Sequence, residues 1–244
     1  MKSKLAVNPI RTRVFELNEP LIPFLINNLE LLASSIDLEA QILAITSKII
    51  SLSEGRILCR EGVEKRELIR SEADLFLGEI GYGCFLTVKE GLLIASAGID
   101  ESNADGDFYI LYPQKPYATA RKIQEKLSAH FGLNRFGVLI TDSHTSPLRV
   151  GVNGVSLAHS GFKGVDNRID STDLFGQKLK MTQVNVADAL AAAAVVCMGE
   201  GAESQPLALV SAPVIFRPSD QDIPNECRVP PEEDLYWPFI QKRI

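Results

Sequence analysis

The sequence has little that would mark a nucleic-acid-binding, membrane-spanning or disulfide-rich protein. It has no excess of positive charge, because the net charge is −6 and the isoelectric point about 5.2. No apolar run approaches the roughly 20 residues of a membrane-spanning helix. We therefore expect neither nucleic acid nor a membrane among its partners. The cysteines stand singly, without CxxC spacing, which predicts reduced thiols at Cys59, Cys84, Cys197 and Cys227.

The composition is that of an ordinary folded protein. Of the 244 residues, 45 % are hydrophobic and 23 % are charged, close to the globular average. Residues 1–9 carry two lysines but no apolar core, so we expect no secretory signal and a cytoplasmic location. There is no internal repeat or low-complexity linker. We expect residues 1–244 to form a single unit, or two lobes whose boundary the sequence does not locate.

Apolar periodicity predicts an α/β (α+β) protein with mixed sheets, because helices and strands alternate only loosely. We expect helices over residues 21–32, 63–76, 118–130 and 184–198, with a short final helix after a proline-rich tail. We expect strands over residues 41–50, 84–88, 92–95, 136–140, 148–158 and 206–214. Glu90 and Gly91 separate two of these strands and predict a hairpin.

The familiar catalytic signatures are missing. The sequence has no GxxxxGK[ST] phosphate loop and no GxSxG elbow, and the glycines of residues 78–83 indicate a turn. The three histidines have no metal-ligand spacing. Only His144, in a polar loop, is expected near a site, while a core or solvated role is favoured for a lone histidine.

Acidic residues follow two of the expected strands. Asp100 comes after residues 92–95, and Asp142 comes after residues 138–141. Ligands collect outside the carboxyl ends of strands, and two carboxylates with Ser102, Asn103 and Ser143 would suit Mg²⁺ or Mn²⁺. The alternative is that each aspartate caps a turn. Similarly, residues 198–205 are either a helix stop or a glycine-supported loop that presents N–H groups to phosphates while Glu200 binds metal.

Several segments occur together in one order. They are residues 50–56 (ISLSEGR), 97–103 (AGIDESN), 137–143 (GVLITDS), 173–176 (DLFG) and 186–194 leading to 198–201 (MGEG). In this combination the chain resembles the coenzyme F420-0:L-glutamate ligase family, over roughly residues 42–210. That family adds γ-linked glutamate to a deazaflavin coenzyme with GTP. The resemblance implies a two-lobed, dimeric ligase of mixed α/β fold.

The resemblance also implies a set of ligands and contacts. It implies two divalent metals, Mg²⁺ or Mn²⁺, at Asp100, Asp142, Ser143 and Glu200, and it associates K⁺ with the family. It implies nucleotide contacts at Ser47, Lys48, Asn103, Met198, Gly199, Gly201, Ala202, Glu203, Ser204 and Gln205. The expected partners are GTP, L-glutamate, a carboxylate acceptor and a second copy of the chain. The carboxylate would be activated as an acyl phosphate, which requires no protein nucleophile.

The sequence departs from the family pattern at positions where cations are expected. Leu52 replaces a lysine, residues 143–146 (SHTS) lack a Gly-Arg pair, and Ser211 with Ala212 replace an Arg-Gly pair. A strongly anionic acceptor should attract arginine and lysine, so these losses favour a different acceptor. Two alternatives remain open: a nucleotide-binding paralogue with no ligase activity, and a structural dimer with no ligand.

Overall fold

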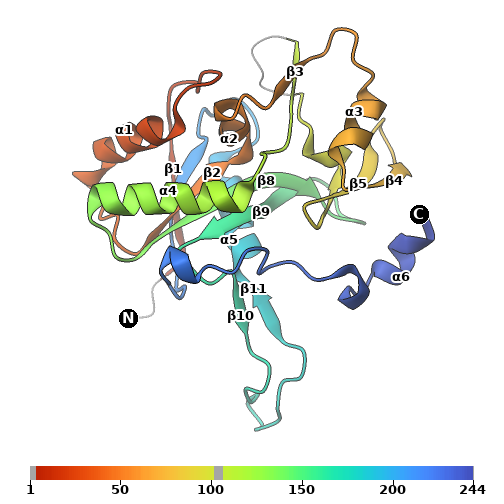
Figure 1. The fold of residues 1–244 in the computed structure, drawn as a ribbon. Helices are drawn as coiled ribbons and strands as arrows, with labels where there is room; N and C mark the ends of the chain where they lie inside the picture. Colours follow the sequence, from red (N-terminus) through yellow and green to blue (C-terminus); the bar gives the residue numbers. More distant parts are fainter. Residues whose placement is uncertain (1–3, 102–106, 244) are drawn as a thin grey trace.

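A five-stranded mixed sheet forms the centre of the computed structural model, which describes residues 4–101 and 107–243 (Figure 1). The strands are, in spatial order, β1 (Ala6–Ile10), β12 (Leu207–Ser211), β2 (Gln41–Thr46), β8 (Phe136–Thr145) and β9 (Val152–Ser160). β2 and β8 run parallel, and the other neighbours are antiparallel. The carboxyl ends of β2 and β8 therefore lie at the same edge of the sheet.

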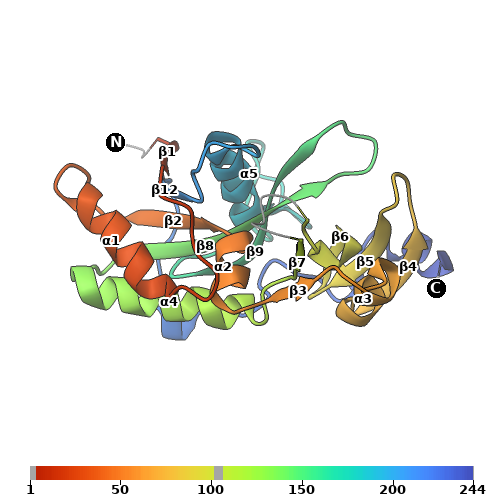
Figure 2. The same cartoon turned by 90° about the horizontal axis from the view of Figure 1, so that it is seen from above.

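Helices cover both faces of this sheet (Figure 2). Helices α1 (Leu21–Ala33) and α4 (Pro116–Phe131) pack on one face, and α5 (Val186–Met198) packs on the other. Alternate residues of β2 explain this: Leu43 and Ile45 join the core under α1 and α4, whereas Ile42 and Ala44 join the core under α5. A strand buried on both faces has the continuous apolar sequence seen here.

A smaller group of elements lies beside the large sheet. It contains the sheet β4 (Leu75–Glu79), β5 (Phe85–Lys89) and β6 (Leu92–Ala95), helix α3 (Lys65–Glu72), and the strand pair β3 (Ile57–Cys59) and β7 (Phe108–Ile110). The hairpin expected around Glu90 and Gly91 is confirmed. After β6, the short helix η1 (Ser96–Gly98) leads directly to Asp100.

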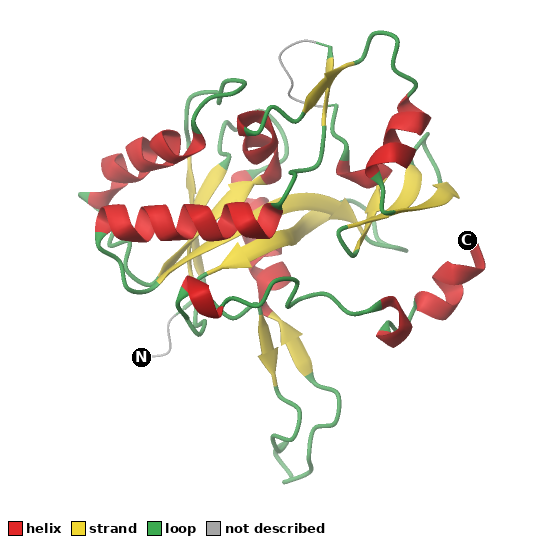
Figure 3. Ribbon diagram, viewed as in Figure 1, coloured by secondary structure: helices red, strands yellow, loops and turns green. Residues whose placement is uncertain are grey.

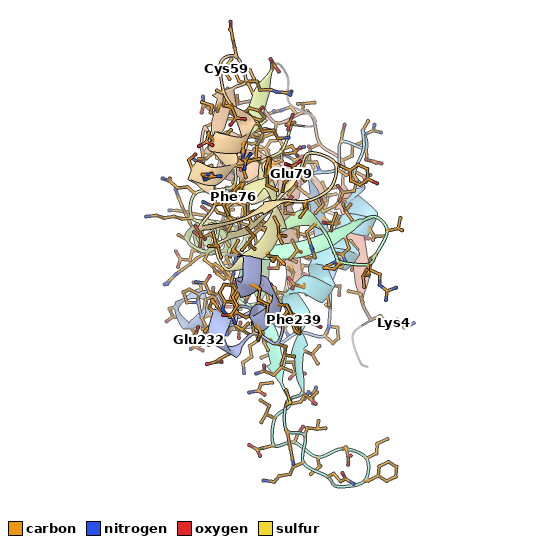
Figure 4. The ribbon with its side chains drawn as sticks, turned by 90° about the vertical axis from the view of Figure 1, so that its right-hand side faces the viewer. Lys4, Cys59, Phe76, Glu79, Glu232 and Phe239 are labelled. Carbon is orange, nitrogen blue, oxygen red and sulfur yellow. The ribbon has the colours of Figure 1, made fainter. Side chains whose placement is uncertain are left out.

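Two segments extend over the surface. Strands β10 (Val165–Asn167) and β11 (Gln183–Asn185) begin a long hairpin, here called the arm, which projects from the body in Figures 1 and 4. The C-terminal segment is mostly irregular and crosses from below α4 towards the small sheet (Figure 3). It includes η2 (Ser219–Gln221), η3 (Pro231–Glu233), α6 (Trp237–Ile240) and η4 (Gln241–Arg243). Among the described residues, no helix has the length and apolarity to cross a bilayer.

The expected α/β class with mixed sheets is confirmed, but several element boundaries were wrong. The strand expected over residues 41–50 ends at Thr46, because Ser47, Ile49 and Ile50 become the buried side of helix α2 (Ser47–Ser53). The helix expected over residues 63–76 ends at Glu72, and Leu75 and Phe76 begin β4 instead. The strand expected over residues 136–140 continues to Thr145.

Candidate active site

A cavity of about 1170 Å³ lies where the ends of β2 and β8 face residues 94–100. Every site residue expected from the sequence and described by the structure lines this cavity. They are Ser47, Lys48, Asp100, Asp142, Ser143, Met198, Gly199, Glu200, Gly201, Ala202, Glu203, Ser204 and Gln205. Asn103 lies outside the described residues. The structure therefore brings together segments that are far apart in the sequence.

The sheet register explains why the first of these residues meet. Thr46 at the end of β2 pairs with Thr141 of β8, so Ser47 and Lys48 emerge beside Asp142. Asp142 and Ser143 are part of β8 itself, although they were expected just after its end. Asp100 is held from the other side, because its backbone N–H and C=O both bond to Ile110 at 2.9 and 2.8 Å.

The charged side chains in the cavity lie close enough to affect one another's ionisation. Lys48 Nζ lies 2.7 Å from Asp100 Oδ2. Desolvation raises the pKa of Asp142 to about 7, and the nearby Asp100 carboxylate adds to the rise. Hydrogen bonds from the Ser143 N–H and the Ser47 side chain, together with Lys48, oppose it. Asp142 is therefore a carboxyl group that lacks enough positive charge around it.

The loop after α5 presents its backbone to an anion. The N–H of Gly201 donates to Glu203 Oε2 at 2.8 Å. Gly199 has φ +84°, and a Cβ there would lie 2.5 Å from Glu203 Cδ, so this close approach requires glycine. Burial of part of the Glu200 carboxyl raises its pKa, while a hydrogen bond with Ser143 and the charge of Lys48 oppose the rise. The loop therefore ends the helix, through the bond from the Gly199 N–H to the Val195 carbonyl, and also directs the Gly201 N–H at a carboxylate.

The donor set suits a hard divalent cation in type but not in spacing. Carboxylate and hydroxyl oxygens are the ligands that Mg²⁺ and Mn²⁺ prefer. Within the described residues, however, no three His, Cys, Asp or Glu side chains converge closely enough to hold an ion. The described lining is nevertheless rich in negative charge, because only Arg13 and Lys48 oppose Glu16, Asp100, Asp142, Glu200 and Glu203.

Sequence reasoning missed part of the lining. Residues 12–17 form one wall, and the N–H of Thr12 bonds to the Ser204 carbonyl at 2.9 Å. This segment has no helix or strand, so no periodicity could reveal it. Tyr112 also lines the cavity although it is 1 % exposed overall. His144 lies in the lining as expected.

A second charged cluster is buried at the far end of β9 and does not appear in this lining. His159 is 1 % exposed, and its Nε2 lies 2.9 Å from Glu226 Oε2. Arg217 reaches Glu226 at 2.8 Å and Asp222 at 3.1 Å, and Asp222 also accepts from Ser160. We refer to these five residues as the strap cluster, and to residues 213–230 as the C-terminal strap. The hydrogen-bond partner of His159, Glu226, lies 67 residues away, so local sequence could not reveal it.

Known proteins identify the class. The family described as F420-0:Gamma-glutamyl ligase matches residues 9–212. Three relatives bear the name coenzyme F420:L-glutamate ligase. The one from Methanopyrus kandleri is 34 % identical over 207 residues, 77 % of this chain and 79 % of the relative. Those from Methanocaldococcus jannaschii and Archaeoglobus fulgidus are 32 % and 29 % identical, each over 81 % of this chain and 90 % of the relative.

The chain is therefore an enzyme of the ligase class, as expected. It belongs to the F420-0:gamma-glutamyl ligase family. Because the match ends at residue 212, the whole C-terminal strap lies beyond the residues that the family model matches.

Proposed function

We propose that this protein is a nucleotide- and divalent-metal-dependent glutamate ligase that adds L-glutamate to a carboxylate acceptor, coenzyme F420-0 or a related compound. The observation that carries the proposal is the meeting of Lys48, Asp100, Asp142, Ser143 and Glu200 in one cavity, beside the Gly199–Gly201 loop. Family membership supports the same reaction type.

The reaction follows from the chemistry of amide formation. A carboxylate and an amine do not condense in water, so an acceptor oxygen first attacks the terminal phosphorus of GTP and GDP leaves. The amine nitrogen of glutamate then attacks the carbonyl carbon of the acyl phosphate. Inorganic phosphate leaves with the electrons of the C–O bond, and the nitrogen loses a proton. When bound, a divalent metal supplies charge neutralisation for the phosphoryl group.

The protein's own residues position these groups. Asp100, Asp142, Ser143 and Glu200 would hold the metals through oxygen atoms after moving closer together, because their described positions do not converge on one point. Lys48 and the N–H groups of the loop that begins at Gly199 would contact the phosphates, the loop releasing its own Glu203 carboxylate. A polyphosphate entering so acidic a cavity needs accompanying cations, which supports metal dependence.

The test is a turnover assay with acceptor, L-glutamate, GTP and Mn²⁺. Phosphate release and an acceptor mass increased by one glutamyl residue are expected together, and ATP, KCl and NaCl arms define the nucleotide and the monovalent ion. Asp142→Asn should abolish turnover, whereas Asp37→Asn, at an exposed turn outside the cavity, should not. If the protein binds nucleotide but turns over no acceptor, it is a nucleotide-binding paralogue and not a ligase.

We also propose that two copies associate through the arm. Its tip exposes Leu174 at 98 % and Phe175 at 87 %, and Met181 is exposed on the returning side. In Figure 4 the arm extends well clear of the body. Large apolar side chains concentrated on a projecting element indicate a protein interface, and identical copies are the commonest partners.

Light scattering tests this association. A dimer is expected at micromolar concentration, and Leu174→Lys with Phe175→Lys should give a monomer. Gln177→Lys, on the same exposed tip, adds one positive charge without removing apolar surface and should leave the dimer intact. A wild-type monomer would overturn this proposal.

A further inference from the structure

A bulge interrupts β9 directly opposite the start of the acidic site. Ile140 pairs with Ala158, but the next residue, Thr141, pairs with Ser156. Leu157 is therefore the extra residue, and it has no partner in the β8–β9 ladder as described. Asp142 is the next residue of β8. A bulge bends its own strand and increases the local twist of the strand pair, and this one lies one residue before Asp142 in the β8–β9 pair.

Arg228 of the C-terminal strap bonds to this bulge. Its Nη2 donates to the Leu157 carbonyl at 3.2 Å. The strap is held in place two residues before Arg228, at Glu226 of the strap cluster. Glu226 Oε2 accepts from Gly164 N–H and from Arg217, each within 2.9 Å, and this holds Arg228 near the bulge. A hydrogen bond from a charged donor such as this one is stronger than one between neutral groups.

The same arginine also contacts the elements that carry Asp100. Its side chain packs on the β5–β6 turn, where a Cβ at Gly91 would lie 2.9 Å from Arg228 Cδ. It lies close enough to Tyr112 to lower the pKa of that buried phenol, although burial raises this pKa to about 12 overall. The Tyr112 ring in turn packs against Gly98, two residues before Asp100, where a Cβ would lie 2.8 Å from its Cδ2.

This contact is held without a complete set of hydrogen bonds. Arg228 Nη1 and the Tyr112 hydroxyl are both buried, and neither has a partner of ordinary geometry in the structure. Arg228 thus lies between the bulge before Asp142 and the ring behind Asp100.

We infer that Arg228 is a positioning residue that sets Asp142 and Asp100 relative to each other, and that the C-terminal strap is a brace required by the acidic site. The brace rests on the contacts just described. Its consequence for metal binding rests on the proposed function, and the two are tested separately.

Hydrogen exchange on the metal-free protein tests the brace. Arg228→Met should make residues 140–145, 155–160 and 94–100 exchange roughly tenfold faster, because a charged hydrogen bond and its packing are lost. Arg228→Lys keeps the charge and one donor, so it should restore part of the protection at the bulge. Leu29→Ala, a core change in α1, provides the control for a general loss of stability.

Manganese titration followed by electron paramagnetic resonance tests the consequence. With GTP present, Arg228→Met should weaken Mn²⁺ binding roughly tenfold or more, as loss of a group that orients metal ligands does, whereas Leu29→Ala should not. Unchanged exchange in the three segments, or a uniform increase like that of Leu29→Ala, would overturn the brace. A wild-type protein that binds no Mn²⁺ would overturn the metal-dependent function, and hydrogen exchange would still decide the brace.

Discussion

Glu226 and Asp142 are both carboxyl groups among charged neighbours near the large sheet, yet their pKa values shift in opposite directions. Burial works against ionisation of each. For Glu226, hydrogen bonds from His159, Arg217 and the Gly164 N–H outweigh burial and hold the pKa at about 2. For Asp142, the partners are too few and the pKa rises to about 7.

The difference separates a structural cluster from a functional one. In the strap cluster Arg217 and His159 face Glu226 and Asp222, so each carboxylate has a buried donor of its own. In the cavity several carboxylates share Lys48. A cluster of carboxylates with too few cations lowers the stability of the fold. Proteins retain such clusters mainly at functional sites.

The strap cluster should be the more sensitive to loss of one partner. Glu226→Gln leaves the buried Arg217 with Asp222 as its carboxylate partner and His159 beside a neutral amide. We expect the free energy of unfolding to fall by about 3 kcal/mol, the lower end of the loss for breaking a buried ion pair. Urea denaturation at pH 7 measures it. A loss below 1 kcal/mol would mean that the cluster is solvated, and the comparison would fail.

The stabilisation by Glu226 should also depend on pH. Its pKa is lower in the folded state than the ordinary value of 4.5. The contribution is therefore present above pH 4.5 and is lost as the pH falls from 4.5 towards 2, by about 3 kcal/mol in all. Denaturation at a series of pH values should show wild type and Glu226→Gln converging in this window. If the stabilities of the two proteins differed by the same amount at every pH, Glu226 would not have a lowered pKa in the folded state.

A positive charge added to the cavity should strengthen nucleotide binding. Leu52 lines the cavity and is only partly buried, so Leu52→Lys should place an ammonium near the nucleotide phosphates. We expect GTP binding to strengthen by about 1.5–3 kcal/mol, measured by calorimetry. Leu58→Lys adds the same charge outside the lining and serves as the control. Equal or weaker binding would show that Leu52 faces the core.

The smallest change in the free energy of unfolding is expected when one carboxylate is removed from the cavity. Asp142→Asn keeps an acceptor for the Ser143 N–H but removes a desolvated charge beside Asp100. We expect the metal-free protein to gain about 1 kcal/mol of stability, while the stabilisation by Mn²⁺ and GTP is lost. Thermal melting with and without these ligands measures both. Equal ligand effects in the two proteins would remove Asp142 from the metal site.

Much of the cavity was predictable, because short motifs name its residues. The parallel strands β2 and β8 explain only why Ser47 and Lys48 lie beside Asp142. Asp100 and Glu200 were named by motifs alone, because Asp100 follows β6 of the small antiparallel sheet and Glu200 follows α5. The ion pair between Lys48 and Asp100 could not be predicted, since it depends on how two segments meet in space. The same applies to Leu157, because a bulge has no signal in one strand, and to Arg228, whose role appears only when the strap has folded back.

Helix α5 alone connects the end of the arm to the loop that carries Glu200. Strand β11 ends at Asn185, α5 begins at Val186, and the helix ends at Met198, just before Glu200. At 1.5 Å per residue this helix is about 20 Å long. Its start is fixed, because Asp188 accepts from the N–H of Ser156 on β9. If two copies associate through their arms, the distance between their cavities would therefore be set by a stiff helix rather than by a flexible linker.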